Sequence, residues 1–247
     1  MDKFAHDIIV PDGQSTLEKK DQVAGMFNDI AERYDLLNRL LSGGIDLIWR
    51  KKALNELKSV QPAKVLDVAT GTAEVAIMTY RQLHPQHITG IDISEGMLAL
   101  GRKKVEEMKL THAIELTYGD SEQLQFPDNN FDAVTVAFGV RNFQNLLKGL
   151  QEMHRVLSPG GKLVVLEFSR PSGWGFKQLY AWYMKNAAPV AGKLLARNQQ
   201  AYEYLNNSVQ AFPEGEQFLQ ILRNAGFSNT YLKKLSFGIC TIYCGSK

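Results

Sequence analysis

Residues 64–74 read KVLDVATGTAE, a short apolar run followed by a loop of small side chains. Apart from Lys64 and Asp67 the run is continuously apolar, which is typical of a strand buried on both faces of a parallel sheet. Thr70 and Gly71 then mark a turn, and a helical pattern follows to about Leu83. The stretch therefore predicts a strand, a tight loop and a helix, the first part of a βαβ unit.

The same alternation continues along the chain. Strands are expected at residues 64–69, 88–92, 113–118, 131–138 and 162–168, with helices between them. Ser94 is a good N-cap for a helix that ends near Met108, and residues 158–161 (SPGG) stop a helix that begins at Leu146. Strands that alternate with helices predict right-handed crossovers and a parallel sheet.

The N-terminal part of the chain has a helical pattern. Apolar residues from Val23 to Leu41 recur at three- and four-residue steps, and residues 42–44 (SGG) end the pattern. Asp46 is then expected to cap a second helix over residues 47–58.

The C-terminal part breaks the alternation. Residues 231–235 and 239–244 are strand-like and meet at residues 236–238 (SFG), which predicts an antiparallel hairpin at the edge of the sheet. The sequence thus predicts an α/β fold in which a mostly parallel sheet of seven strands carries N-terminal helices and a helical insertion. One domain over residues 1–247 is expected, composed of a helical cap (1–60), a core (61–170), the insertion (171–213) and a C-terminal helix and hairpin (214–247).

The composition argues against several classes of protein. With 247 residues, 45% of them hydrophobic and 22% charged, the chain can build a sizeable core, which argues against disorder and a coiled coil. A net charge of +2 argues against a nucleic-acid partner, and no apolar run is long enough for a signal peptide or a membrane span. Cys240 and Cys244 on one strand would have Cα atoms roughly 13 Å apart, too far for a disulfide. We therefore expect a reduced, cytoplasmic protein.

The candidate ligand site follows the predicted strands. Ligands of open parallel sheets bind outside the carboxyl ends of the strands, where the strand order reverses. Taken singly, the loop at 67–73 and Asp92 are explained as well by a tight turn and a strand-end aspartate as by a ligand site. For Asp120 and Ser121 alone, a plain polar loop is the better explanation. The residues at these ends are 67–73, 92, 120–121, 138–142 and 167–170.

Two nucleoside cofactors compete for this position. Asp92 follows Gly71 by twenty-one residues, the spacing at which a carboxylate reaches a ribose diol. A dinucleotide fits poorly, because its glycine pattern puts Glu74 where helix and strand must pack closely, and Asp67 would repel a pyrophosphate. S-adenosylmethionine has no phosphate, and its ammonium, carboxylate, ribose and adenine match Asp67, the loop backbone, Asp92 and Asp120.

Longer segments resemble a known family. VLDVATGTAE (65–74), GIDISEGML (90–98), YGDSEQLQFPDNNFDAV (118–134) and HRVLSPGGKLVVLE (154–167) resemble the motifs of class I S-adenosylmethionine-dependent methyltransferases, which have a Rossmann-like fold. More narrowly, FNDIAERYDLLN (27–38), FGVRN (138–142), LEFSRP (166–171) and YEYLNNSVQAFP (202–213) resemble the ubiquinone/menaquinone biosynthesis C-methyltransferase family. The similarity runs from about residue 22 to the end. It implies transfer of a methyl group to a ring carbon of a demethylated, prenylated quinol.

The resemblance also implies positions for the cofactor. Carried over by motif, the contacts are Thr72, Asp92, Asp120 and Ser121, to which the strand ends add Asp67, Gly71 and Phe138. Ala69 and Ala73 depart from the glycine-rich pattern of the class, so the geometry of this loop is the part that the resemblance defines least.

For the chemistry, the expected residues lie after the fourth and fifth strands. Arg141 is expected to stabilise a phenolate, Glu167 to relay its proton and Asn142 to orient a quinol oxygen. Tyr34, beside Asp35 on the first helix, is expected to close over the substrate. A surface salt bridge for Arg141 and structural roles for Glu167 and Tyr34 are the alternatives.

The insertion and the remaining motifs complete the functional expectation. Five aromatic residues in the insertion favour an apolar groove at the inner face of a membrane over a plain core helix: Trp174, Phe176, Tyr180, Trp182 and Tyr183. His84 and His87 are the closest histidines, but Pro85 interrupts any helix there, so no metal site is predicted. Demethylmenaquinol is favoured as the acceptor. A 2-polyprenyl-6-methoxy-benzoquinol, another small-molecule acceptor, a catalytically silent cofactor- and lipid-binding scaffold, and a homodimer stay open.

Overall fold

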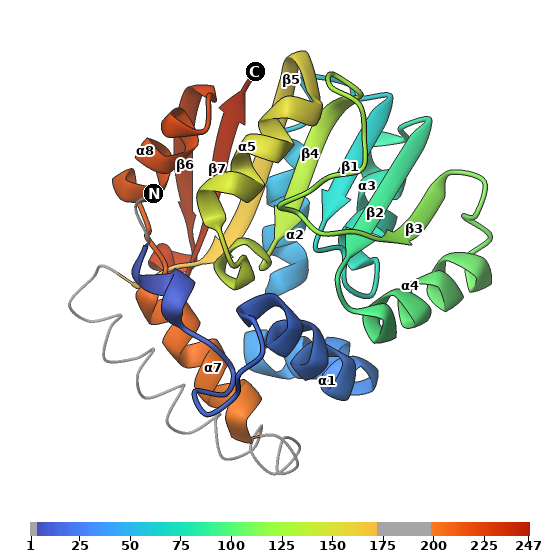
Figure 1. Cartoon of the computed structure of the whole chain (residues 1–247). Coiled ribbons are helices and arrows are strands. Elements are labelled where there is room, and N and C mark those ends of the chain that lie inside the picture. Colours follow the sequence, from blue (N-terminus) through green and yellow to red (C-terminus); the bar gives the residue numbers. More distant parts are fainter. Residues whose placement is uncertain (1–3, 172–198) are drawn as a thin grey trace.

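The computed structural model describes residues 4–171 and 199–247 (Figure 1). Its single sheet has the strand order β3-β2-β1-β4-β5-β7-β6. The first five strands of this order are parallel, and β7 is antiparallel to both of its neighbours. The strands are β1 (Lys64–Val68), β2 (His87–Asp92), β3 (Ile114–Tyr118), β4 (Phe131–Ala137), β5 (Leu157–Phe168), β6 (Ser228–Leu235) and β7 (Cys240–Ser246). The predicted α/β fold with its C-terminal hairpin is confirmed.

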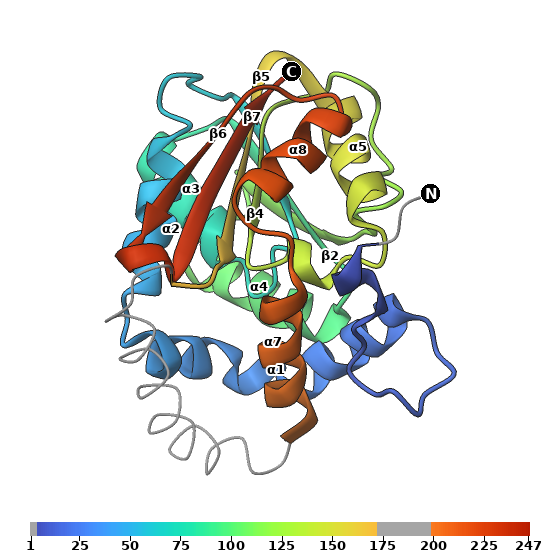
Figure 2. The same cartoon turned by 90° about the vertical axis from the view of Figure 1, so that its left-hand side faces the viewer.

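Helices cover both faces of the sheet and the carboxyl ends of its parallel strands, at the bottom of Figure 1. The described α-helices are α1 (Lys19–Ser42), α2 (Asp46–Asn55), α3 (Glu74–Leu83), α4 (Glu95–Glu107), α5 (Leu146–Val156), α7 (Gln199–Ala211) and α8 (Glu216–Asn224). The described residues also include 3₁₀ turns at η1 (Ala5–Ile8), η2 (Val140–Asn142) and η3 (Ser236–Gly238). Figure 2 shows α2 and α3 on one side of the sheet and α5 and α8 on the other.

Each face of the sheet has its own core. On one face Leu150 of α5 and Phe218 of α8 pack with inward side chains of β1, β4 and β5. On the other, Trp49 of α2, Ile77 of α3 and Leu98 of α4 pack with the opposite side chains of the same strands. The central strands β1 and β4 are buried on both faces, which explains their largely apolar sequences.

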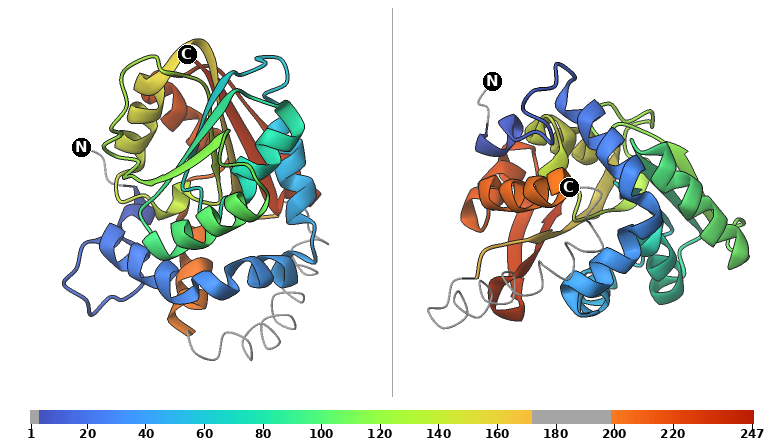
Figure 3. Two further views of the ribbon diagram at one scale, coloured as in Figure 1. Left: turned by 90° about the vertical axis from the view of Figure 1, so that its right-hand side faces the viewer. Right: turned by 90° about the horizontal axis from the view of Figure 1, so that it is seen from below.

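Helix α1 belongs to neither core. It lies across the carboxyl ends of the parallel strands, as the view from below in Figure 3 shows. Its contacts are mainly with α4 and to a smaller extent with α2. The helix therefore covers the edge of the sheet at which ligands of this architecture bind.

The predicted helix cap at Ser94 is confirmed, whereas the predicted cap at Asp46 is wrong. The Ser94 hydroxyl accepts from the Met97 amide and caps α4. The residue before α2 is Ile45, which makes no side-chain cap, and Asp46 is the first helical residue. Its carboxylate instead accepts from Arg39 and from the Ser42 hydroxyl, because the chain turns back on itself between α1 and α2.

The start of β5 was also predicted wrongly. Residues 158–161 were expected to form a loop, but β5 begins at Leu157, which pairs with Phe131 across a bulge. Gly160 donates to the carbonyl of Lys247 and Gly161 accepts from its amide, so the end of β7 extends the ladder. This pairing joins residues far apart in the chain and left no local signal. Similarly, α2 ends at Asn55 rather than at residue 58.

The expectations about a membrane span, a metal site and the aromatic insertion can be compared only with the described residues. Within the described residues, no helix has both the length and the apolarity needed to cross a bilayer. Among these residues there is also no group of three His, Cys, Asp or Glu side chains that could hold a metal ion. The insertion is described only from Gln199 onwards, so its five aromatic residues, Trp174, Phe176, Tyr180, Trp182 and Tyr183, lie outside the described residues.

Candidate functional site

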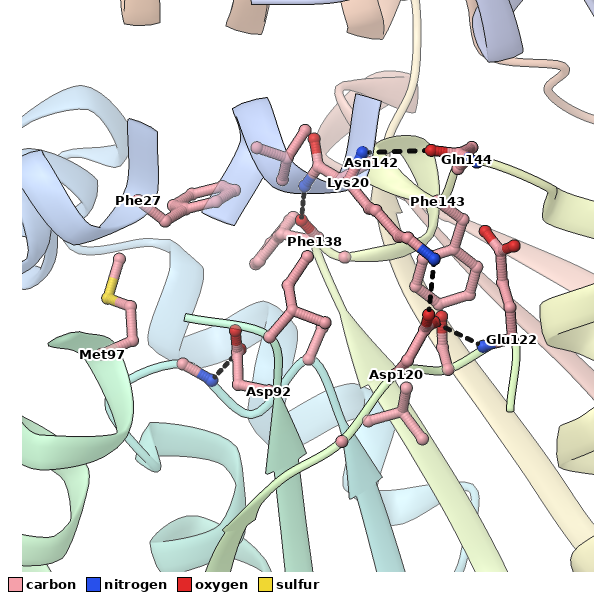
Figure 4. A pocket seen from close by; sticks show the side chains of 18 of the residues that line it. Lys20, Phe27, Asp92, Met97, Asp120, Glu122, Phe138, Asn142, Phe143 and Gln144 are labelled. Atoms are coloured by element: carbon pink, nitrogen blue, oxygen red, sulfur yellow. Dashed lines mark hydrogen bonds and ion pairs between the residues drawn. The ribbon is translucent and has the colours of Figure 1, made fainter. Parts of the chain in front are cut away.

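A pocket lies at the carboxyl ends of the first four strands, beneath α1 (Figure 4). It is centred where β1 has β2 on one side and β4 on the other, the point at which the strand order reverses. Its residues come from the ends of β1 to β4 and the loops after them, from α1 and from the start of α4. They include Lys20, Val23, Phe27, Tyr34, Ala69, Gly71, Asp92, Ile93, Met97, Asp120, Ser121, Glu122, Phe138, Gly139, Asn142, Phe143 and Gln144.

The loop after β1 forms the floor of the pocket. Its backbone adopts positive φ at Ala69 (54°), Gly71 (56°) and Ala73 (65°). A left-handed conformation is strained for alanine, so the loop keeps the shape of a glycine-rich turn at a cost of about 1–3 kcal/mol per alanine. Gly139 allows the close approach of the next loop, because a Cβ there would lie 2.6 Å from the Cβ of Ala69.

Asp92 connects this loop to the start of α4. Its Oδ2 accepts from the Gly71 amide at 2.8 Å, and its Oδ1 accepts from the Ser94 amide at 2.9 Å. Burial raises the pKa of Asp92, while these backbone donors oppose the shift. Each carboxylate oxygen has a second lone pair, so Asp92 can still accept from a pair of hydroxyl groups in the pocket.

Asp120 and Ser121 form the wall after β3. Asp120 Oδ1 accepts from the Glu122 amide at 2.8 Å, and Oδ2 lies 3.4 Å from the Lys20 ammonium. The Asp120 carboxylate raises the pKa of Lys20. This half-exposed ion pair closes one side of the pocket from α1, and such pairs are weak enough to exchange with a ligand.

Apolar side chains line the rest of the pocket. The rings of Phe27 and Tyr34 meet edge to face, with centroids 5.8 Å apart. Ile93, Met97 and Phe138 also line the pocket. A flat aromatic ligand could bury both faces in such a slot.

Polar and charged contacts hold α1 over the pocket. The Asn28 side-chain oxygen accepts from the Ser94 hydroxyl and from the Gly96 amide, both at 2.8 Å. Asp35 accepts from the Thr72 hydroxyl at 2.7 Å and from Lys104. Farther along the helix, Arg39 donates to Glu74 at 2.7 Å.

A buried ion pair lies behind the pocket, on η2 and at the end of β5. Arg141 is 5% exposed and Glu167 is fully buried. The Arg141 Nη1 donates to Glu167 Oε1 at 2.8 Å and to the Phe138 carbonyl at 2.5 Å. Burial raises the pKa of Glu167, and the Arg141 charge opposes that shift. Asn142, next on η2, reaches the pocket itself.

Comparisons with known proteins identify the family. The model of the ubiE/COQ5 methyltransferase family matches residues 15–247. The chain belongs to the ubiE/COQ5 methyltransferase family. This confirms the family resemblance found in the sequence motifs.

Similar proteins of the ubiE/COQ5 family cover nearly the whole chain. A demethylmenaquinone methyltransferase of Bacteroides fragilis is 47% identical over 230 residues, which are 93% of this chain and 94% of that protein. The ubiquinone/menaquinone biosynthesis C-methyltransferase UbiE of Geobacter sulfurreducens is 46% identical over 231 residues, 93% of this chain and 90% of its own.

Solved structures agree on the fold. An S-adenosylmethionine-dependent methyltransferase from Aquifex aeolicus has a TM-score of 0.55 at 20% identity and covers 79% of this chain and 88% of that one. The [4+2]-cyclase SpnF has a TM-score of 0.62 at 18% identity, covering 92% of this chain and 96% of that one. A cyclase among the neighbours shows that this fold alone does not assign a reaction. Membership of the ubiE/COQ5 family does assign one: this family member is an S-adenosylmethionine-dependent methyltransferase.

The pocket fits S-adenosylmethionine better than a dinucleotide. The Gly71 amide, which would face a pyrophosphate in a phosphate-binding loop, already donates to Asp92. The nearby charged side chains are three carboxylates and one lysine, Asp92, Asp120, Glu122 and Lys20. This set favours hydroxyl, amino and cationic groups over phosphates, as the sequence predicted.

Seven of the site residues predicted from the sequence line this pocket: Tyr34, Gly71, Asp92, Asp120, Ser121, Phe138 and Asn142. Thr72, Asp67, Arg141 and Glu167 do not line it. Thr72 donates instead to Asp35 of α1. Arg141 is not in a surface salt bridge, which corrects that alternative, because η2 turns its side chain inward onto Glu167.

Asp67 requires a correction. It was expected to meet the amino group of the cofactor, but it lies beneath the loop and is 1% exposed. Its carboxylate accepts from the Thr70 hydroxyl at 2.7 Å and from the Thr135 hydroxyl at 2.6 Å. Burial raises its pKa to about 6, although the two hydroxyl donors lower it. Asp67 therefore holds the loop in place from below.

Sequence reasoning missed several pocket residues. Val23 and Phe27 belong to the apolar stripe of α1 and were assigned to packing, because a stripe at helical spacing does not show what it packs against. Met97 likewise reads as a core residue of α4. Lys20 and Gln144 had no signal, since their approach depends on how α1 crosses the loops.

Proposed function

We propose that this methyltransferase transfers a methyl group from S-adenosylmethionine to a ring carbon of a demethylated prenyl quinol, with demethylmenaquinol as the acceptor. The choice of acceptor rests on the 47% identity to a demethylmenaquinone methyltransferase over nearly the full length of the chain. The pocket at the reversal of strand order has carboxylates that disfavour phosphate, which supports S-adenosylmethionine as the methyl donor. We also propose that residues 1–247 act as one methyltransferase domain.

Roles for the pocket residues follow from their free hydrogen-bonding capacity. Asp92 binds the ribose hydroxyls of the cofactor, and Asp120 with Ser121 binds the adenine amino group. The backbone at Gly71 and the ring of Phe138 enclose the amino-acid end. Tyr34 and Phe27 close the slot from α1. The bound cofactor supplies an electrophilic methyl group on a positively charged sulfur.

The protein's part in the chemistry is to orient the acceptor and favour its charged form. A phenol near pKa ~10 is mostly protonated at neutral pH, so a nearby cation and a proton acceptor increase its nucleophilicity. Arg141 stabilises the negative oxygen, and Asn142 orients it from the wall of the pocket. As the new carbon–carbon bond forms, the carbon–sulfur bond breaks, and the ring hydrogen then leaves as a proton.

We assign to Glu167 the role of accepting this proton. Its Oε1 accepts from Arg141 Nη1 and from the Phe168 amide, at 2.8 and 2.9 Å. Its Oε2 has one long contact, 3.4 Å from the Arg141 amide. We assign the proton to Oε2, because that oxygen gives up least when it is protonated.

Labelled product identifies the acceptor. Wild-type protein is incubated with S-adenosylmethionine carrying a labelled methyl group and, separately, with demethylmenaquinol or the 2-polyprenyl-6-methoxy-benzoquinol, and the lipids are analysed by mass spectrometry. Label on the naphthoquinol ring supports the proposal. Label on the benzoquinol alone assigns the ubiquinone reaction instead, and cofactor binding without labelled lipid supports the scaffold alternative.

We further propose that the protein contacts a membrane surface when it collects its substrate. Large apolar side chains are exposed where α2 begins and at η3: Ile45, Leu47, Ile48 and Phe237. A 2.8 Å hydrogen bond from Trp49 to Ser236 ties these two segments together. An apolar patch of this kind is suited to the boundary between headgroups and acyl chains.

Vesicle flotation tests this surface. Ile48→Asp combined with Phe237→Ser is expected to abolish flotation with quinone-loaded vesicles, whereas Tyr118→Ser, an exposed aromatic at β3, is expected to have no effect. Flotation of all three proteins alike would contradict the role of the patch. A location at the inner face of a membrane rests on this contact, and the homodimer stays a prediction that sedimentation velocity tests directly.

A further inference from the structure

Three polar atoms beside the pocket are buried and have no hydrogen-bond partner within residues 4–171 and 199–247. They are Arg141 Nε, Asn142 Oδ1 and Tyr204 Oη. Arg141 and Asn142 belong to η2, and Tyr204 belongs to α7, which packs against η2. Buried polar atoms are nearly always paired, so three unpaired atoms on adjacent elements require an explanation.

Tyr204 is the member of this group that comes from outside the sheet. It is 3% exposed, and the charges that act on it are those of Arg141 and Glu167. Burial raises the pKa of its hydroxyl above the usual range, and Glu167 adds to that shift while Arg141 opposes it. At neutral pH the group is therefore a hydroxyl that can donate a hydrogen bond into the cluster.

Neighbouring polar atoms of Arg141 and Asn142 have partners, whereas these three have none among the described residues. Arg141 Nη1 is committed to Glu167 and to the Phe138 carbonyl, and Asn142 Nδ2 has a 3.5 Å contact with the same carbonyl. The remaining set consists of two donors, Arg141 Nε and Tyr204 Oη, and one acceptor, Asn142 Oδ1. A phenolic hydroxyl accepts two hydrogen bonds and donates one, so it matches this set.

We propose that Tyr204 is a binding residue for the acceptor, and that its hydroxyl, with Arg141 Nε and Asn142 Oδ1, forms a subsite for one ring oxygen of an aromatic diol. This inference rests on the proposed function. Asn142 also lines the cofactor pocket, so the oxygen subsite adjoins that pocket. When the ring oxygen loses its proton, the two donors hold the resulting charge and the Asn142 side chain turns its amide toward it.

Tyr204→Phe tests the hydroxyl alone, and Tyr243→Phe is the matched control. Tyr243 is also a buried tyrosine, but its oxygen accepts from the Gly215 amide at 2.9 Å, away from the pocket. Removing an unpaired hydroxyl should leave the melting temperature unchanged or raise it, whereas removing the paired one should lower it. A fall in stability for Tyr204→Phe would show that its hydroxyl has a structural partner and would overturn the proposal.

Binding and kinetics then report on the subsite. The expected result for Tyr204→Phe is a loss of about tenfold or more in kcat/KM for the quinol, with an unchanged affinity for S-adenosylmethionine. In equilibrium binding, wild-type protein should prefer 1-naphthol to naphthalene, and Tyr204→Phe should lose most of that preference. The ratio of the two affinities is internal to each protein, so it is independent of the fraction that is folded.

The outcomes separate this inference from the proposed function. If wild-type protein methylates the quinol and Tyr204→Phe matches it in both kcat/KM and the naphthol preference, the Tyr204 subsite is wrong and the function stands. If wild-type protein methylates neither quinol and shows no preference for 1-naphthol, the function and the subsite fail together.

Discussion

Single residues at equivalent positions have different roles in this protein. Asp67 lies near the end of β1 and Asp92 at the end of β2, and both are strand-end aspartates in sequence. Asp67 accepts from two threonine hydroxyls and lies under the loop, whereas Asp92 accepts from two backbone amides and borders the pocket. The partners of each carboxylate, rather than its position in the motif, therefore define its role.

The raised pKa of Asp67 makes stability depend on pH. The folded-state pKa, about 6, is above the ordinary value of 3.8, so the folded protein binds the proton more tightly than the unfolded chain. Stability from this group is therefore present below about pH 4 and is lost as pH rises through 6, by about 3 kcal/mol in all. Asp67→Asn should flatten this slope in urea unfolding between pH 4 and 7. Asp21→Asn, at an exposed carboxylate, should keep the wild-type slope, and equal slopes for all three proteins would contradict the assignment.

Asp92→Asn should weaken cofactor binding. The asparagine side chain has one acceptor oxygen, whereas the Gly71 and Ser94 amides each need one. One of these two hydrogen bonds is therefore lost, and so is the second oxygen that would accept from a ribose hydroxyl. We expect a loss in affinity for S-adenosylmethionine of about tenfold to a hundredfold by calorimetry. Asp132→Asn is the control, because Asp132 also accepts from two backbone amides but lies at the opposite end of the sheet. Similar losses in both variants would indicate a general effect on folding.

The buried pair of Arg141 and Glu167 should couple strongly. Arg141→Met leaves an unpaired buried carboxylate and should lower the free energy of unfolding by about 3–5 kcal/mol near neutral pH. Adding Glu167→Gln should restore much of that loss, because the charge is removed while an acceptor remains for the Phe168 amide. Lys103→Met, in an exposed pair with Glu107, should cost at most about 1 kcal/mol. Additive losses in the double variant would contradict a direct pair.

At the scale of elements, α1 is attached to the domain by its side-chain contacts rather than by a core. Its stripe of Val23, Phe27 and Tyr34 faces the pocket, and its contacts at Asn28 and Asp35 reach α4 and the loop after β1. An amphipathic stripe needs a partner surface, and here a ligand can supply part of it. The helix is therefore expected to depend on the ligand more than the sheet does.

Asn28→Ala tests this attachment. The change removes two 2.8 Å hydrogen bonds to α4, so the free energy of unfolding should fall by about 1–2 kcal/mol, and the affinity for S-adenosylmethionine should fall several-fold. Asp29→Ala changes the exposed neighbouring residue on the same helix and should affect neither quantity. Unaltered cofactor affinity in Asn28→Ala would mean that α1 does not cover the bound ligand.

At the scale of the whole molecule, stability is unevenly distributed. The sheet is packed on both faces, while α1 lies outside both cores. Saturation with S-adenosylmethionine at a hundred times its Kd should add about 2.7 kcal/mol to the free energy of unfolding. Amide hydrogen exchange should slow in α1 (Lys19–Ser42) more than in β4 (Phe131–Ala137). Equal slowing in both segments would argue against a ligand-dependent helix.

Local patterns in the chain were sufficient for the number and order of the strands, the parallel sheet, the Ser94 cap and the strand ends that supply the pocket, but not for the starts of β5 and β6. Each depends on neighbours in sequence: hydrophobic runs, turn residues and cap residues act over a few positions. The same patterns failed at Asp46, whose partner Arg39 is on the preceding helix, and at the start of β5, which pairs with Phe131 and the last residue.

Contacts between distant segments required the folded chain. The inward turn of Arg141 onto Glu167, the position of Asp67 under its loop, and the approach of Lys20 to Asp120 each join residues separated by 26, 68 or 100 positions. Tyr204 meets η2 only because α7 folds back beneath the sheet. A side chain's type and spacing indicate the chemistry it can perform, but its charge state and its partners depend on burial and on long-range packing, which no local stretch of sequence encodes.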